Sequence, residues 1–266
     1  MFGAETASLA ATPPPPPPPL DAEAVPLVTL SNVAFADTKT VLKHLTLTVR
    51  PGEIVGLAGI SGGGQETLLR GLAGIAPTVA GSLTVAGQAL AGRSLPHFLR
   101  AGVHYLPASR MEEGLFPGLS LLDHLRLAFP EARHEARAIF ANRCVAGFHL
   151  TNVPDAGAAS LSGGNQQRLL LSLVPDDTRL LLADNPTRGL DAASIAQIWE
   201  HFRARAAGGA AVLFFSEDLD ELLAQAGRVL VFYNRRLVAD LPAGRFDAAR
   251  VGELMTGRAD GQEERA

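Results

Sequence analysis

The sequence predicts an α/β fold with a mainly parallel central sheet. Short apolar or β-branched segments alternate with helical segments along the chain after Gly52. The segment 54–59, IVGLAG, has no polar side chain, as expected for a strand that is covered on both faces. A block of helical character, about residues 109–160, separates two strand-rich regions. We therefore expect a helical subdomain inserted into the α/β core.

The composition restricts the class of protein. A chain of 266 residues that is 47% apolar can bury a substantial core. Its net charge of −4 gives no electrostatic argument for binding nucleic acid. The single Cys144 cannot form an internal disulfide, which fits a reducing compartment. The sequence shows neither a secretory signal nor the eighteen apolar residues of a membrane span. We expect a soluble, cytoplasmic protein that reaches a membrane only through another chain.

The first residues differ in character from the rest. Residues 13–19 are seven consecutive prolines, which exclude helix and sheet ladders and favour an extended polyproline II rod. At about 3.1 Å per residue the rod spans roughly 22 Å, as a stiff spacer or, alternatively, as a ligand for aromatic grooves. We expect residues 1–25 to be a disordered leader, residues 26–258 to form the folded domain, and residues 259–266 to be a polar tail.

Each element of the domain has its own sequence signal. From Leu27, two short segments, VTLSNV and LTLTV, predict an antiparallel pair of strands. Ser120 is the expected N-cap of a helix, and residues 131–148 continue the helical period. Asn234 tolerates the left-handed turn of a hairpin formed by RVLVFYNRRLVADL. The other expected strands are 81–87, 103–107, 179–184 and 211–216, and the other expected helices are AASIAQIWEHFRARA, DLDELLAQA and FDAARVGELM.

A glycine-rich loop connects the strand at 54–59 to a helix. Small residues let backbone N–H groups wrap a phosphate, and a following lysine and a Ser or Thr hydroxyl supply a cation and a magnesium ligand. The backbone cradle is present, but Gln65 and Glu66 stand at the lysine and hydroxyl positions, with Thr67 a substitute if the register slips by one. The alternative is a tight glycine turn without a ligand. The candidate phosphate-binding residues are Gly59, Ser61, Gly62, Gly63, Gly64, Gln65, Glu66 and Thr67.

Two later stretches complete the pattern. In RLLLADNPTRGLD an apolar strand delivers Asp184 to its C-terminal end, where parallel sheets bind ligands, and Asp184 is the candidate magnesium ligand. The octet LSGGNQQR, residues 161–168, opens into an apolar helix. Its serine and glycines therefore lie at a helix start, where unpaired N–H groups and the helix dipole attract an anion.

The octet resembles the signature loop of ATP-binding cassette (ABC) ATPases, in the form typical of cassettes that drive sugar-type and nucleoside-type importers. GEIVGLAG, the glycine loop, YLPASR and PTRGLD extend this resemblance from about Leu27 to Gly257. It implies a P-loop NTPase fold of the ABC type, with an antiparallel β subdomain and an inserted helical subdomain, that binds ATP and Mg²⁺. Taken together the motifs look most like the C-terminal cassette of importers that carry two cassettes in one polypeptide.

The chain departs from the family's catalytic pattern, so no residue is assigned a catalytic role. Asn185 stands where the family has a glutamate that activates water, and an amide cannot act as a general base. Weak or metal-poor ATP binding at the chain's own loop is the expectation. Phe35 is the candidate aromatic for stacking on adenine, with a core phenylalanine as the equal alternative. The five departures are Gln65, Glu66, Ala108 at the glutamine-loop position, Asn185, and Glu217 at a histidine position.

The resemblance also implies partners. ABC cassettes pair head to tail, so the signature loop of this chain would contact the γ-phosphate of ATP held by a second, catalytically intact cassette. The helical block would dock on transmembrane permease subunits at the inner face of the cell membrane, and a solute-binding protein would be an indirect partner. Alternatives are a stand-alone homodimeric ATPase and a regulatory or scaffold protein. The residues expected to reach the partner's nucleotide are Ser162, Gly163, Gly164 and Gln166.

Overall fold

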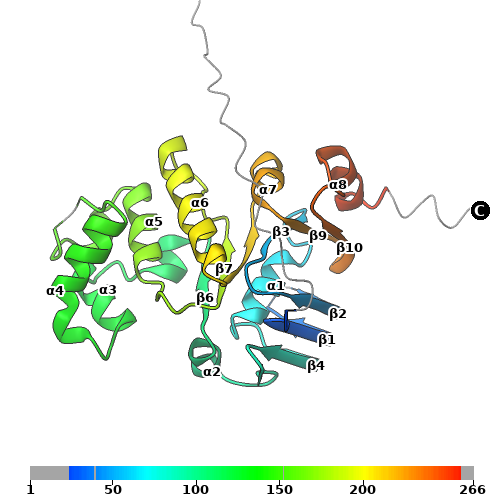
Figure 1. Cartoon of the computed structure of the whole chain (residues 1–266), viewed down its shortest axis with the longest axis horizontal. Helices are drawn as coiled ribbons and strands as arrows, with labels where there is room; N and C mark the ends of the chain where they lie inside the picture. The colour runs from blue at the N-terminus through cyan, green and yellow to red at the C-terminus, as the bar shows by residue number, and fades with distance from the viewer. Residues whose placement is uncertain (1–23, 39, 152, 259–266) are drawn as a thin grey trace, which may run out of the picture.

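The computed structural model describes residues 24–258 with the exception of residues 39 and 152. The leader, for which we expect disorder, lies almost wholly outside these residues, and the polar tail at 259–266 lies outside them. The central sheet consists of β3 (Ile54–Gly59), β6 (Val103–Leu106), β7 (Leu180–Asp184), β8 (Ala211–Phe215), β9 (Arg228–Tyr233) and β10 (Arg236–Pro242). Its order is β10-β9-β3-β8-β7-β6, and every neighbouring pair is parallel except β9 with β10. The predicted mainly parallel α/β sheet is confirmed (Figure 1).

A second sheet is antiparallel, and its strands come from the chain on either side of β3. It consists of β1 (Val28–Ala36), β2 (Val41–Val49), β4 (Thr78–Val85) and β5 (Gln88–Ala89), in the order β2-β1-β4-β5. The predicted pairing of the first two strands is confirmed, with Val28 opposite Val49 and Phe35 opposite Leu42. This sheet is the antiparallel β subdomain that the sequence indicates.

Helices cover both faces of the central sheet. On one face α1 (Gln65–Leu72) buries Leu68, Leu69 and Leu72 in a core that it shares with the antiparallel sheet. On the other face lie α5 (Gly163–Ser172), α6 (Ala192–Ala207), α7 (Leu219–Gln225) and α8 (Ala248–Met255). Alternate residues of β7 face opposite cores: Leu180 and Leu182 pack toward α1, whereas Leu181 and Ala183 pack toward α6. The short α2 (Leu95–Arg100) precedes β6.

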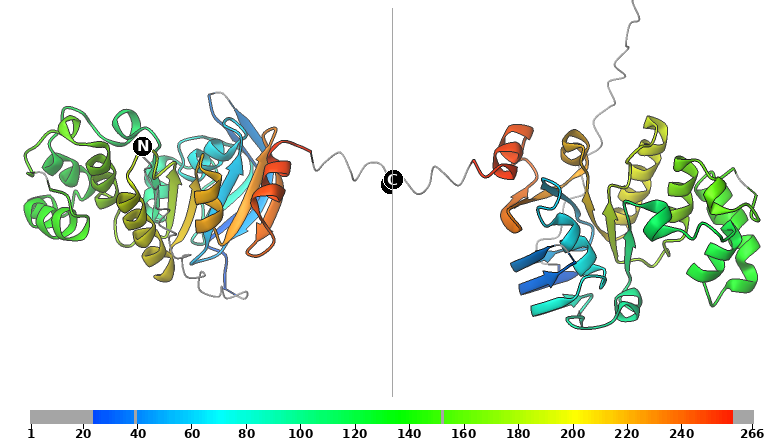
Figure 2. Two further views of the ribbon diagram at one scale, coloured as in Figure 1. Left: turned by 90° about the horizontal axis from the view of Figure 1, so that it is seen from above. Right: turned by 180° about the vertical axis from the view of Figure 1, so that it is seen from behind.

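The helical insertion lies between β6 and β7, and Figures 1 and 2 show it at one end of the molecule with α8 at the other. Ser120 is confirmed as an N-cap, because its hydroxyl accepts the Asp123 N–H and Asp123 reaches back to the Ser120 N–H. The expected continuous helix at 131–148 is wrong. It breaks into a 3₁₀ turn at 133–135, the short α4 (Ala136–Ile139) and a π-helical segment at 140–147. α3 spans Leu121–Ala128, and further single turns span Arg110–Gly114 and Ala158–Ser160.

The closing elements agree with the sequence. The β9–β10 hairpin turns at Asn234 and Arg235, which both adopt positive φ, 46° and 62°. Among the described residues no helix is long and apolar enough to cross a membrane.

Candidate nucleotide site

The glycine loop joins the C-terminal end of β3 to the first turn of α1, so the predicted strand, loop and helix are confirmed. Gly62 and Gly64 adopt φ of 78° and 122°, which side-chain-bearing residues rarely occupy. Ser61 and Gly62 are exposed, while Gly64 lies against Leu42. The backbone of the loop is therefore shaped as the phosphate-cradle interpretation requires.

The side chain of Gln65 fills this loop from within. It is fully buried, and its Nε2 donates a hydrogen bond to the Ile60 carbonyl at 3.0 Å. A Cβ atom placed on Gly59 would lie 2.7 Å from Gln65 Nε2, and one on Gly63 would lie 2.8 Å from Oε1. Gln65 Oε1 has no hydrogen-bond partner among the described residues. The position that a phosphate-binding lysine would occupy thus holds an inward-folded neutral amide.

A cavity of about 480 Å³ lies in front of the loop, at the C-terminal edge of the sheet. Among the described residues its lining includes four carboxylates and one guanidinium: Asp37, Glu66, Glu113, Asp184 and Arg70. Arg70 is paired with Asp37 at 3.1 Å and with Glu113 at 3.1 Å, which leaves Glu66 and Asp184 without a described cation. Ser61, Thr67 and Ala108 also line the cavity. The described lining is thus dominated by carboxylates.

Asp184 is the last residue of β7, as predicted, and it is only 7% exposed. Its carboxylate accepts hydrogen bonds from Asn185 Nδ2 at 2.9 Å and from the Tyr105 hydroxyl at 3.3 Å. Burial and the negative charge of Glu66 raise the pKa of Asp184 to about 6. At neutral pH this carboxyl is therefore mostly ionised, at an energetic cost that comes from its burial and from Glu66.

Asn185 has a structural role. It adopts φ of 46°, donates to Asp184, and its Oδ1 accepts the Glu217 backbone N–H at 3.0 Å. The exposed Glu217 carboxylate faces the Arg188 guanidinium at 3.8 Å. Asn185 and Glu217 therefore link the C-terminal ends of β7 and β8 to one another. They stand at the positions where the family has a water-activating glutamate and a phosphate-contacting histidine. Among the described residues no cluster of three or more His, Cys, Asp or Glu could hold a metal ion.

The signature octet begins α5 as predicted. The exposed Ser162 is the N-cap, and its hydroxyl accepts the Asn165 N–H at 3.4 Å. Gln166 is partly exposed, and its Nε2 donates to the Leu161 carbonyl at 3.2 Å. The described lining of the 480 Å³ cavity includes none of Ser162, Gly163, Gly164 or Gln166. The chain therefore does not bring its signature loop to its own phosphate loop.

Phe35 is a core residue, so its candidate role in adenine stacking is not supported. The ring is 0% exposed in β1, and a Cβ atom on Gly71 of α1 would lie 2.4 Å from its Cγ. Gly71 thus makes room for the ring beneath the helix. Thr67 is 4% exposed in α1 and reaches the wall of the cavity, one helical position after Glu66.

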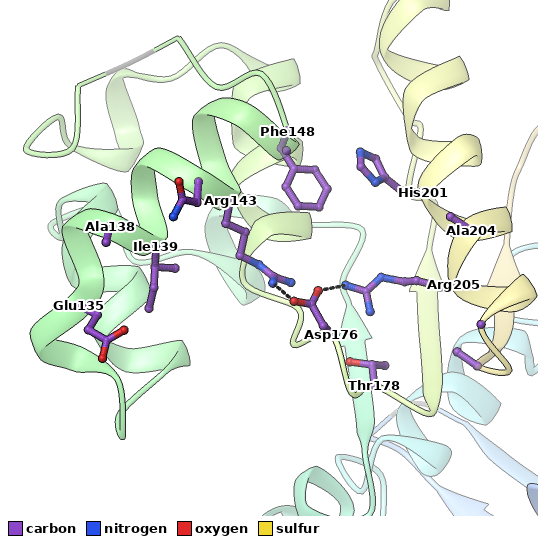
Figure 3. Close-up of a pocket in the computed structure, with 14 residues that line it drawn as sticks. Glu135, Ala138, Ile139, Arg143, Phe148, Asp176, Thr178, His201, Ala204 and Arg205 are labelled. Atoms are coloured by element: carbon purple, nitrogen blue, oxygen red, sulfur yellow. Dashed lines mark hydrogen bonds and ion pairs between the residues drawn. The ribbon is translucent and has the colours of Figure 1, made fainter.

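A larger cavity of about 710 Å³ lies between the helical insertion and α6, away from both loops. Asp176 pairs with Arg143 at 2.7 Å and with Arg205 at 3.9 Å (Figure 3). Both arginines also donate to carbonyls at and just after the C-terminus of α5, those of Ser172, Val174 and Pro175. His201 stacks on Phe148 with ring centroids 4.3 Å apart and is half-buried. These groups fasten the end of α5 rather than form a phosphate site.

Tyr105, Arg70, Asp37 and Glu113 are cavity residues that the motifs do not reveal. Tyr105 belongs to the motif YLPASR and Glu113 lies three residues after it, but no motif assigns either residue a role. Asp37 reaches the cavity from just after β1, Arg70 from α1 and Glu113 from the insertion, through side-chain contacts that span up to 43 residues of sequence.

The two sheets, the glycine loop, the helical insertion and the serine-capped α5 define a nucleotide-binding cassette of the ABC type. The chain belongs to the ABC transporter family, whose model matches residues 42–188, more than half of the chain.

Curated relatives include a glucose import ATP-binding protein of Haloferax volcanii, 36% identical over 88% of this chain and 46% of the relative. A ribose import ATP-binding protein of Burkholderia pseudomallei is 34% identical over 85% of this chain and 45% of the relative. The chain thus spans about half the length of these relatives.

Among solved structures, an ATP-binding subunit of an ABC transporter superposes with a TM-score of 0.72 at 23% identity, over 88% of this chain and 99% of that one. The dimeric post-hydrolysis state of an ATP-binding cassette with ADP and phosphate gives a TM-score of 0.70 at 20% identity, over 82% of this chain and 100% of that one. These similarities establish the cassette fold.

Proposed function

We propose that this chain is the non-hydrolysing nucleotide-binding subunit of a sugar-type ABC importer, which lends its signature loop to a partner's ATP. One contrast carries the proposal. The exposed, serine-capped start of α5 is intact, whereas the chain's own phosphate loop is filled by Gln65 and faces a carboxylate-rich cavity.

The chain's own loop would bind ATP weakly or not at all. A charge-assisted hydrogen bond is worth about 1.5–3 kcal/mol, so replacing the usual lysine by Gln65 weakens phosphate binding roughly 10- to 150-fold. Glu66 adds a negative charge where the family has a magnesium-binding hydroxyl. The one guanidinium that lines the described cavity, Arg70, is already paired with Asp37 and Glu113 and does not balance the charge of a triphosphate.

The partner would be a second cassette with an intact lysine and glutamate. Support for a paired arrangement comes from the separation of the two loops within this chain and from the dimeric cassette with ADP and phosphate that shares its fold. The relatives, about twice as long, leave room for two such cassettes, and the motifs point to the C-terminal one.

The rest of the assembly follows from the relatives' names. They are glucose and ribose import ATP-binding proteins, so we propose a sugar as the transported solute. The helical insertion, about residues 109–160, would dock on permease subunits and hold the cassette at the inner face of the membrane. A solute-binding protein would deliver the sugar without touching this chain.

The test is ATP turnover by the purified chain, by a catalytically intact cassette of the same transporter, and by their mixture. The proposal predicts no turnover by this chain alone and a turnover by the mixture that exceeds that of the intact cassette alone. Turnover by this chain alone that is abolished by Ser162→Arg would contradict the proposal and support a homodimeric ATPase. A chain that binds neither a cassette nor a permease would support a scaffold role.

A further inference from the structure

We propose that Arg110 is a positioning residue that holds the signature helix and the loop 185–191 together as one unit. The proposal deepens the function above, on which its catalytic consequence rests. Arg110 is the first residue of the helical insertion, in the π-helical turn Arg110–Gly114.

The guanidinium of Arg110 contacts both loops at once. Its Nε donates to Gln167 Oε1 on α5 at 2.9 Å, and its Nη2 donates to the backbone carbonyl of Arg188. Its Nη1 lies against the first residue of α5, since a Cβ atom on Gly163 would be only 3.1 Å away. The glycine at this signature position therefore leaves room for the arginine.

The acceptor on α5 is dedicated to this contact. Gln167 is 2% exposed, and its Oε1 is the acceptor for Arg110. Its Nε2 has no hydrogen-bond partner among the described residues, and a reversed carboxamide would turn this NH₂ group toward the Arg110 donor. Removal of Arg110 would leave both polar atoms of a buried amide unpaired, which is a costly state.

The loop 185–191 is held at several points, and within it the Thr187 hydroxyl donates to Glu221 Oε2 at 2.8 Å. At its start, Asn185 is hydrogen-bonded to Asp184 and to the backbone of Glu217. Further along, the Arg188 N–H donates to the Asn185 carbonyl at 3.2 Å, and the Arg188 carbonyl accepts from Arg110. Arg110 is the residue that joins this loop both to the helical insertion and, through Gln167, to α5.

The far end of α5 has its own anchor. Arg143 Nε donates to the Ser172 carbonyl at 2.6 Å, and Arg205 Nη1 donates to the Pro175 carbonyl at 2.9 Å. Arg110 fastens the half of α5 that bears Ser162 and Gly163 to the insertion, and Arg168 fastens it to Ser194 and Gln197 of α6. Since Arg110 belongs to the insertion, a displacement of the insertion would move both loops together.

The contact requires an arginine. Burial and the charge of Arg188 lower the pKa of Arg110, but a guanidinium remains protonated at any physiological pH. Its planar fork points donors at two acceptors simultaneously, which the single ammonium of lysine cannot do with the same geometry.

The test uses Arg110→Gln and Arg110→Lys in the full chain. Arg137→Gln is the matched control, because Arg137 is an exposed arginine of the same insertion that is paired with Asp155. Hydrogen exchange on the chain alone should rise at least tenfold in both segments, 162–168 and 185–191, for Arg110→Gln. The rise should be smaller for Arg110→Lys and absent for Arg137→Gln.

The second readout is ATP turnover by the mixture with an intact partner cassette. Arg110→Gln should lower kcat at least tenfold and change KM for ATP less than threefold, because the partner's own loop grips the nucleotide. Unchanged exchange in either segment would overturn the positioning role. An unchanged kcat, in a mixture that Ser162→Arg inactivates, would overturn its catalytic consequence. If Ser162→Arg also has no effect, the proposed function fails, and the exchange data still decide the positioning role.

Discussion

The carboxyl of Asp184 should make the folded chain less stable as the pH rises, and Asp184→Asn should remove this effect. The side chain is nearly buried, and burial together with the charge of Glu66 raises its pKa to about 6. Asparagine has the same shape and keeps an acceptor for the Asn185 amide. It also offers a donor to the Tyr105 hydroxyl, so the substitution neutralises the charge without emptying the site.

The size and sign of the effect follow from proton linkage. Between the ordinary pKa of 3.8 and about 6, the folded chain holds a proton at Asp184 that the unfolded chain has lost, so stability falls as pH rises. Above pH 6 both states are ionised and the penalty is constant. A difference of about two pKa units corresponds to about 3 kcal/mol. The advantage of Asp184→Asn should be about 1 kcal/mol at pH 4.5 and about 3 kcal/mol at pH 7.5.

Urea denaturation of wild type and Asp184→Asn at these two pH values measures the difference. Glu66→Gln is the companion variant, since it removes the neighbouring charge, and it should stabilise the chain less than Asp184→Asn at pH 7.5. The two effects should not add, because each substitution removes part of the same repulsion. An advantage for Asp184→Asn that is the same at both pH values, or that is larger at pH 4.5, would show that the pKa of Asp184 is not raised in the folded chain.

Three further predictions concern the two loops. Gln65→Lys combined with Glu66→Ser should raise the affinity of the isolated chain for Mg²⁺-ATP roughly 10- to 150-fold, measured by calorimetry, because it restores a charge-assisted phosphate contact and a magnesium-binding hydroxyl; no gain would show that another group blocks the loop. Ser162→Ala should lower the unfolding free energy by about 1 kcal/mol through loss of the N-cap, seen as a lower urea midpoint at constant slope. Asn185→Ala should lower the unfolding free energy by about 2–4 kcal/mol, because it leaves buried polar groups unpaired and places alanine at a positive φ. Asn185→Gly should lose less, because glycine adopts positive φ without strain; an equal loss for both variants would show that the backbone conformation of residue 185 contributes nothing.

Local signals in the sequence predict much of the fold. The apolar run of β3, the alternation of β1 and β2, and the turn at Asn234 are each set by residues close in the chain. The helical insertion is less predictable. Residues 131–148 have an α-helical apolar period, but the structure breaks it into 3₁₀, α and π segments, and packing of Phe140 and Cys144 into the core accompanies the break.

The parts of the site that a local backbone conformation defines can be predicted from the sequence. The parts that depend on contacts between side chains far apart in the chain cannot. The glycine loop, Asp184 at the end of β7 and Ser162 at the start of α5 follow from the motifs. The inward direction of the Gln65 side chain does not follow from them, because the motif gives the identity of the residue and not the direction in which its side chain points. Burial of Phe35 depends on a glycine 36 residues later, Gly71, and nothing near Phe35 signals it.

In the proposed function Ser162 contacts a nucleotide held by another cassette. ATP turnover by the mixture of this chain with an intact partner cassette tests it most directly, with Ser162→Arg compared with Ser94→Arg. Both serines are exposed N-caps, but Ser94 precedes α2, far in sequence from both loops. The account predicts that Ser162→Arg abolishes turnover while Ser94→Arg leaves it unchanged. Full turnover by the Ser162→Arg mixture, with the variant still bound to its partner, would contradict the account.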